Sequence, residues 1–256
     1  MADKRSPVGV FDSGVGGIGT LAALRRELPK ERFLFYGDTA NAPYGTKTRE
    51  ACMACIDHVM QRLLAQDVKA VVIACNTASA VAAAELRARC ELPIVAIEPA
   101  LKPAYELRRD GTILVLATPM TLQLEKFRAL YERYGEGAVP LPCPGLMELV
   151  EQEAHEQARR YLTELFSPYD LNRVDAVVLG CTHYVFLRPI LRELLPDTVS
   201  VLDGNQGTAR QLRRVLTARG LLADGVGSVT LETSGDPAKV IPVMERLLVR
   251  AEKELQ

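Results

Sequence analysis

The chain has 256 residues, of which 48% are hydrophobic and 25% are charged, as is ordinary for a folded globular protein. Its net charge of −1 gives no basic excess of the kind that binds nucleic acid or an anionic membrane. No apolar run is long enough to span a bilayer, and residues 1–7 lack the apolar segment of a signal peptide. We therefore expect a cytoplasmic protein that binds neither nucleic acid nor membrane, with six free cysteines.

The first hundred residues alternate short apolar strands with helices. Strands are predicted at 8–11, 33–36, the run that ends at Cys75, and 94–97, with helices over 20–28, 49–64 and 78–89. Pro29 stops the first of these helices. Strands this short, apolar and unbroken are typical of a parallel sheet that is covered on both faces.

The next hundred residues repeat this order of elements. The predicted strands are 112–116, 139–141, the run that ends at Cys181, and 199–202, with helices over 122–134, 147–166 and about 186–195. The residues that follow equivalent strands match at offsets of 105 or 106 positions: Ser13 with Thr118, Asp38 with Cys143, and Cys75 with Cys181. The tail adds a helix over 208–219, a strand at 229–232 and a helix over 238–255. The repeated order indicates a structural duplication.

We therefore predict an α/β fold made of two pseudo-symmetric parallel-sheet domains, with the active site in the cleft between them. The first domain is expected to comprise residues 1–98 plus 208–256, and the second residues 99–207. In each domain a cysteine would lie at the carboxyl end of a strand, where open parallel sheets bind their ligands.

The two cysteines occur in closely similar stretches. Residues 68–78 read VKAVVIACNTA and residues 174–184 read VDAVVLGCTHY. Two thiols on opposite sides of one cleft suit a reaction in which one takes a proton from a carbon and the other returns one, giving the mirror image. Cys75 directly precedes a helix whose dipole would favour its thiolate, and His183 lies two residues after Cys181.

Six motifs then resemble those of cofactor-independent two-cysteine glutamate racemases, in family order over nearly the whole chain. They are VFDSGVGG at 10–17, GDTANAPYG at 37–45, ACNTASA at 74–80, IEP at 97–99, GCTHY at 180–184 and TSGDP at 233–237. The related aspartate racemases typically carry a glutamate after the second CT, where this chain has His183.

The resemblance implies a role for each matching residue. Cys75 would be the base toward D-glutamate and Cys181 the base toward L-glutamate. Asp12 and His183 would assist the thiols, with Asp38 and Glu151 as further acidic groups. The implied substrate-binding residues are Asp12, Ser13, Pro43, Tyr44, Gly45, Asn76, Thr77, Thr118, Thr121, Thr182 and His183. The resemblance further implies no cofactor, no metal, a homodimer, glutamate as the small-molecule substrate, and D-glutamate for peptidoglycan synthesis.

Read without the resemblance, several of these residues fit ordinary structural roles. Asp12 and Ser13 equally fit a helix cap, Tyr44 and Gly45 a turn, and Glu151 a solvated helix charge. The chain also departs from the usual family pattern at Gly145, Val185 and Gly204, among other positions.

Other functions compete with the racemase interpretation. Gly14-x-Gly16-x-x-Gly19 fits a dinucleotide-binding fingerprint, with Asp38 placed to contact a ribose, and would predict a nicotinamide-dependent dehydrogenase. Against this, Asp12 would place a carboxylate near the pyrophosphate, and the paired cysteines would be unexplained. A protein that only binds an amino acid would need neither thiol. A racemase acting on aspartate or another amino acid stays open.

Overall fold

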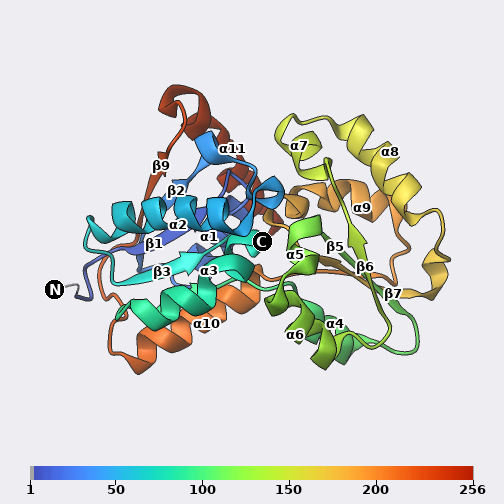
Figure 1. Cartoon of the computed structure of the whole chain (residues 1–256), viewed down its shortest axis with the longest axis horizontal. Helices are drawn as coiled ribbons and strands as arrows, with labels where there is room; N and C mark the ends of the chain where they lie inside the picture. The colour runs from blue at the N-terminus through green and yellow to red at the C-terminus, as the bar shows by residue number, and fades with distance from the viewer. Residues whose placement is uncertain (1–2, 256) are drawn as a thin grey trace. The chain divides into compact units, whose positions relative to one another are not determined.

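The computed structural model describes residues 3–255 and divides into two compact units. The first unit comprises Met1–Glu98 and Asn205–Gln256, and the second comprises Pro99–Gly204. Each unit is built around its own parallel sheet (Figure 1). Among residues 3–255, no helix is both long and apolar enough to cross a membrane.

The first unit contains a five-stranded sheet with strand order β4-β3-β1-β2-β9. The strands are β1 (Val8–Asp12), β2 (Arg32–Gly37), β3 (Ala70–Ile73), β4 (Ile94–Ala96) and β9 (Ser228–Thr233). All neighbouring pairs are parallel, and Phe11 of β1 lies opposite Tyr36 of β2 and Ile73 of β3. Because β9 pairs with β2, the tail of the chain completes the sheet that the first hundred residues begin.

Helices cover both faces of this sheet. On one face, α1 (Ile18–Glu27), α10 (Asn205–Ala218) and α11 (Pro237–Glu254) share one apolar core with alternate strand residues such as Val8 and Val10. On the other face lie α2 (Arg49–Leu64) and α3 (Asn76–Arg89), where Leu63 of α2 packs close to Gly9 (Figure 1). Burial on both faces explains why these strands are continuously apolar.

The second unit contains a four-stranded parallel sheet with strand order β6-β5-β7-β8. Its strands are β5 (Thr112–Ala117), β6 (Ala138–Pro142), β7 (Val174–Leu179) and β8 (Ser200–Asp203). One face packs on α4 (Leu101–Leu107) and α6 (Glu125–Tyr134) through a core that includes Leu101, Ile113 and Phe127. The remaining helices are α5 (Pro119–Gln123), α7 (Leu146–Glu151), α8 (His155–Phe166) and α9 (Arg188–Leu194).

The structure corrects three sequence-based assignments in the second unit. Helix α4 was not predicted, and its third residue is Pro103, which the first turn of a helix tolerates. The single helix expected over 122–134 is interrupted at Leu124, whose backbone is extended. The single helix expected over 147–166 is also two helices, because Glu153 has a left-handed backbone with φ of 52° that ends helical continuity.

Candidate active site

Three neighbouring strands of the first unit end in polar or reactive residues at one edge of the sheet. Asp12 ends β1, Asp38 follows β2, and Cys75 follows β3 by two residues. The edge is held by backbone hydrogen bonds, with the Asp38 amide donating to the Asp12 carbonyl at 3.0 Å and the Ala74 amide to that of Phe11 at 2.8 Å. Because β3, β1 and β2 are neighbours in the sheet, these three side chains lie together at the edge where a parallel sheet binds ligands.

The Cys75 thiol is buried and has two polar neighbours. Its sulfur lies 3.4 Å from the Ser13 hydroxyl and accepts a hydrogen bond from the Ala78 amide, also at 3.4 Å. Cys75 is the N-cap residue of α3, so it lies at the positive end of the helix dipole. All three features favour the thiolate form, which is the form that can accept a proton from carbon.

Asp38 is the centre of a second polar cluster. Its carboxylate, buried at 1% exposure, accepts hydrogen bonds from the Tyr44 hydroxyl at 2.6 Å and from the Asn41 side-chain amide at 3.0 and 3.2 Å. Burial, followed by this hydrogen bond and the charge of Asp38, raises the pKa of Tyr44 far above its usual value. Tyr44 therefore stays a neutral donor at physiological pH. Asn41 was missed in the sequence because it belongs to a stretch that reads as a turn.

The glycine-rich loop after β1 packs around Asp12. The Asp12 carboxylate accepts a hydrogen bond from the Gly14 amide at 2.8 Å. A Cβ added at Gly17 would lie 2.6 Å from the Cβ of Asp12, so only glycine allows this approach. Asp12 is fully buried, and both Gly14 and Gly17 lie against its side chain. This use of the glycines differs from the cradling of a pyrophosphate, which needs donors directed at an anion.

The second unit shows the same arrangement at the ends of its strands. Thr118 follows β5, Cys143 follows β6, and Cys181 follows β7 by two residues. The Cys143 amide donates to the Ala117 carbonyl at 2.9 Å, and the Gly180 amide donates to that of Leu116 at 2.7 Å. The positions matched in the sequence at offsets of 105 or 106 thus occupy equivalent places in the two sheets.

Cys181, His183 and Glu151 form a linear series of side chains. The Cys181 sulfur lies 3.9 Å from Nδ1 of His183, and Nε2 of His183 lies 2.9 Å from Oε1 of Glu151. His183 is buried and the Glu151 side chain is 33% exposed. Burial acts to raise the pKa of Glu151, but the hydrogen bond and charge of His183 outweigh it, so this pKa lies below its ordinary value. The carboxylate can therefore orient the imidazole and stabilise its charged form.

Two buried residues beside Cys181 were not assigned a role from the sequence. The Tyr184 hydroxyl donates to the carbonyl of Cys143 at 3.1 Å and so ties the segment after Cys181 to the end of β6. Burial and the nearby Cys181 raise the pKa of the Cys143 thiol to about 12. Cys143 therefore stays protonated near neutral pH, and Cys181 is the thiol with an imidazole beside it.

The uncharged residues expected to bind substrate lie at the same two edges. Asn76, Thr77 and Thr182 are buried, and Asn76 and Thr77 begin α3 directly after Cys75. Oδ1 of Asn76 is buried and accepts no hydrogen bond from residues 3–255. In the second unit, the Thr118 hydroxyl lies 2.8 Å from that of Thr121 and accepts the Thr121 amide at 3.2 Å, which caps α5. Pro43 and Gly45 flank Tyr44 in the loop after β2.

Groups that could hold a metal ion were also sought. Within residues 3–255, no cluster of three or more His, Cys, Asp and Glu side chains has a suitable arrangement.

A protein-family model described as Asp/Glu/Hydantoin racemase matches residues 20–212, which span parts of both units. The chain belongs to this racemase family. It is therefore an isomerase.

Individual relatives agree with this assignment. A glutamate racemase of Bifidobacterium adolescentis is 47% identical over 255 residues, covering 96% of this chain and 98% of that protein. The crystal structure of the glutamate racemase isoform RacE1 from Bacillus anthracis has a TM-score of 0.86 at 30% identity, over 96% of this chain and 95% of that one. The glutamate racemase of Thermus thermophilus, solved with β-chloro-D-alanine, has a TM-score of 0.83 at 37% identity, over 96% and 94%. The α/β class expected from the sequence is thereby confirmed for this racemase.

Proposed function

We propose that this racemase interconverts L- and D-glutamate by proton transfer at Cα, with Cys75 and Cys181 as the two bases. The observation that carries the proposal is that each of two equivalent strand ends places a buried thiol close to polar groups. Those groups are Ser13 and the Ala78 amide at Cys75, and His183 with Glu151 at Cys181. The identity of the substrate is inferred from the relatives, which are named glutamate racemase.

In the direction from L- to D-glutamate, the Cys181 thiolate removes the Cα proton. The electron pair of the broken C–H bond stays on Cα until the Cys75 thiol delivers its proton from the opposite face. The product then has the inverted configuration, Cys181 is a thiol and Cys75 is a thiolate. The reverse direction exchanges these roles. His183, oriented by Glu151, stabilises the charge on Cys181 and can carry a proton to or from it.

The substrate would be held by uncharged donors that bind its carboxylates and by acceptors that bind its ammonium group. Amides and hydroxyls of Ser13, Asn76, Thr77 and Thr182 suit the two carboxylates of glutamate. The orphan Oδ1 of Asn76 suits the ammonium group, which the Asp12 carboxylate would also attract. Such fixed donors can stabilise the charge that develops when the proton leaves Cα.

The biological setting is inferred from the family resemblance. We propose that the enzyme acts in the cytoplasm, as a homodimer and without a bound cofactor, and supplies D-glutamate for peptidoglycan synthesis.

The proposal is tested with purified enzyme and no added cofactor. L-Glutamate and L-aspartate are incubated separately, and the enantiomers are separated by chiral chromatography. We expect D-glutamate to approach an equal mixture with L-glutamate, with aspartate converted far more slowly. Faster conversion of aspartate would show that glutamate is not the preferred substrate. No conversion of either amino acid would reject the proposed racemisation.

A further inference from the structure

The first unit has a cavity of about 480 Å³ at the edge of the sheet opposite to Cys75. It is lined by the amino ends of β2 and β9, at Phe33 and Ser228, and by the carboxyl ends of α1 and α11, at Arg26 and Leu255. Cys75, Asp12 and Asp38 lie at the carboxyl ends of the strands. A molecule in this cavity would therefore not occupy the candidate active site.

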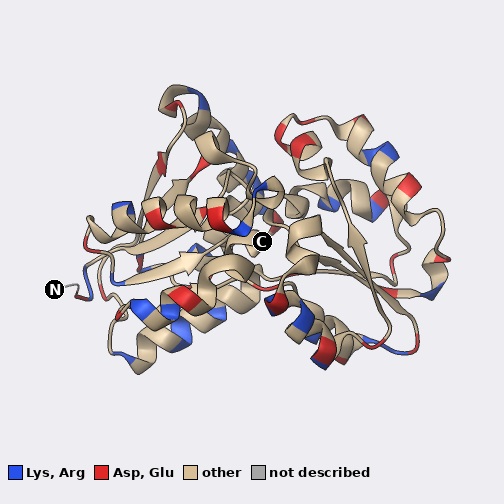
Figure 2. Ribbon diagram, viewed as in Figure 1, with Lys and Arg blue, Asp and Glu red and all other residues tan. Residues whose placement is uncertain are grey.

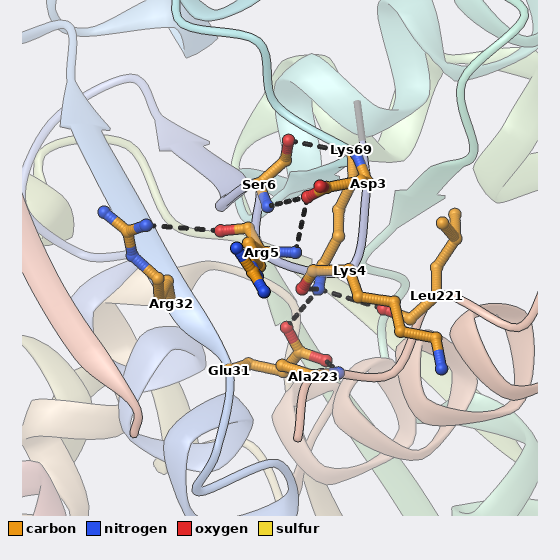
Figure 3. A network of polar contacts seen from close by, with 9 residues as sticks. All are labelled: Asp3, Lys4, Arg5, Ser6, Glu31, Arg32, Lys69, Leu221 and Ala223. Atoms are coloured by element: carbon orange, nitrogen blue, oxygen red, sulfur yellow. Dashed lines mark hydrogen bonds and ion pairs between the residues drawn. The ribbon is translucent and has the colours of Figure 1, made fainter. Parts of the chain in front are cut away.

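The charged groups around the cavity carry an excess of positive charge. Arg25 and Arg26 line it together with Glu31 and Glu252. The carboxylate of Glu31 forms an ion pair with buried Lys69, whose Nζ lies 2.6 Å away, and accepts a hydrogen bond from the Ala223 amide at 2.8 Å (Figure 3). Because Lys69 balances the charge of Glu31, the two arginines of the lining face one unbalanced carboxylate, that of Glu252.

The two arginines contact acceptors that the last turns of α11 provide. Arg25 is paired with the Glu252 carboxylate, and Arg26 donates to the Leu255 carbonyl oxygen. Both contacts are accessible to solvent, with side-chain exposures of 39% for Arg25 and 37% for Glu252 in the first of them. An anion that enters the cavity can replace these acceptors, since exposed ion pairs contribute little stability.

Apolar side chains form another part of the lining, from Ala22, Leu28, Pro29, Phe33 and Leu255, next to Gly227 and Ser228. A concave site of this volume that combines apolar side chains with charged groups can bind a small organic molecule. Guanidinium groups bind carboxylate, sulfonate and phosphate groups with paired hydrogen bonds.

We propose that this cavity is a second binding site, for a small organic anion with an apolar body, separate from the substrate site. Arg25 and Arg26 would bind the anionic group, and the apolar wall would contact the rest of the molecule. Glu252 would compete with the ligand for Arg25.

The probe for this test is 8-anilinonaphthalene-1-sulfonate, which joins an aromatic body to a sulfonate. The intact protein is titrated with the probe at saturating glutamate, and its fluorescence is recorded. We expect saturable binding that glutamate does not displace. Arg26→Ala should raise the Kd at least about tenfold, because a hydrogen bond to a charged group is lost. Glu252→Gln should lower the Kd, because a competing carboxylate is removed.

Arg133→Ala is the matched control, because Arg133 is an exposed arginine of α6 in the second unit. It should leave the Kd unchanged, and all three variants should keep the thermal midpoint of the parent protein within a few degrees. Absence of probe binding, displacement by glutamate, or an equal Kd in Arg26→Ala and the parent protein would each overturn the proposal.

Discussion

Nε2 of His183 lies 2.9 Å from Oε1 of Glu151, although the two residues are 32 positions apart in the chain. Glu151 ends α7, while His183 belongs to the short 3₁₀ segment η4 (Thr182–Leu187) that follows Cys181. These two segments pack against each other. In the proposed mechanism, this contact would make Glu151 a positioning residue that acts on Cys181 through the imidazole.

Glu151→Gln should lower kcat in both directions by about tenfold, less than loss of a group that transfers the proton itself. KM for glutamate should change little, because Glu151 acts through His183. Assays from both enantiomers measure this. A rise in KM with unchanged kcat would instead indicate that Glu151 binds substrate.

The same variant should also change how stability depends on pH. The pKa of Glu151 is lowered in the folded protein from its ordinary value of 4.5, so its stabilising effect is present above that pH and is lost as pH falls through the folded value. The difference in thermal midpoint between parent and Glu151→Gln should therefore be largest near neutral pH and shrink below pH 4.5. A difference that grows toward acid pH would contradict this sign.

Cys75→Ala and Cys181→Ala should each lower the rate of racemisation at least about 100-fold, since each removes one of the two proton-transferring groups. The thermal midpoint should change little, because the substitution removes one small side-chain atom. Cys90→Ala is the control, because Cys90 is a free cysteine that follows the last turn of α3. Near-full turnover in either of the first two variants would refute the two-base scheme.

Ser13→Ala should move the acidic limb of the kcat/KM profile for D-glutamate to higher pH. The Ser13 hydroxyl lies 3.4 Å from the Cys75 sulfur, and its loss removes a donor that favours the thiolate. The limb for L-glutamate, which depends on Cys181, should shift less. Equal shifts for both enantiomers would show that Ser13 acts on the substrate and not on one thiol.

Tyr44→Phe should destabilise the protein by about 1.5–3 kcal/mol, because it removes a hydrogen bond to a buried carboxylate. The hydroxyl of Tyr44 lies 2.6 Å from Asp38, whose other partner is Asn41. Denaturant unfolding measures the change. Tyr105→Phe is the control, since Tyr105 is an exposed tyrosine of α4. Equal free energies of unfolding for the two variants would show that the hydrogen bond contributes nothing.

The buried pair of Lys69 and Glu31 should be important for stability. Nζ of Lys69 also donates to the carbonyls of Lys4 and Leu221 at 2.8 and 2.9 Å (Figure 3). Lys69→Met should cost about 3–5 kcal/mol, because it leaves the Glu31 charge buried without its partner. The double variant with Glu31→Gln should recover part of this loss. A double variant no more stable than Lys69→Met would place the effect in the lost carbonyl contacts.

The strand ends of both units could be predicted from the sequence because short apolar runs stop at recognisable polar residues. The runs before Cys75 and Cys181 are of this kind, and both cysteines lie at the carboxyl ends of parallel strands. The distribution of charge gives no such guide to function, since Lys, Arg, Asp and Glu are spread over the helices of both units (Figure 2).

Contacts between distant segments could not be predicted in the same way. The break between α7 and α8 depends on the left-handed Glu153, a conformation that the residue type does not signal. That break ends α7 at Glu151, beside His183. Asn41 and Tyr184 were missed because their partners, Asp38 and the Cys143 carbonyl, are defined only once the chain has folded.

The central claim, proton transfer at Cα by two thiols, is tested most directly by proton NMR in deuterium oxide. The enzyme is incubated separately with L- and D-glutamate, without added cofactor. Loss of the Cα proton signal together with formation of the opposite enantiomer is the predicted result, with inversion at least about 100-fold slower in Cys75→Ala and Cys181→Ala. Inversion that persists at a near-parental rate in either variant, or inversion without exchange of the Cα proton for deuterium, would contradict the account.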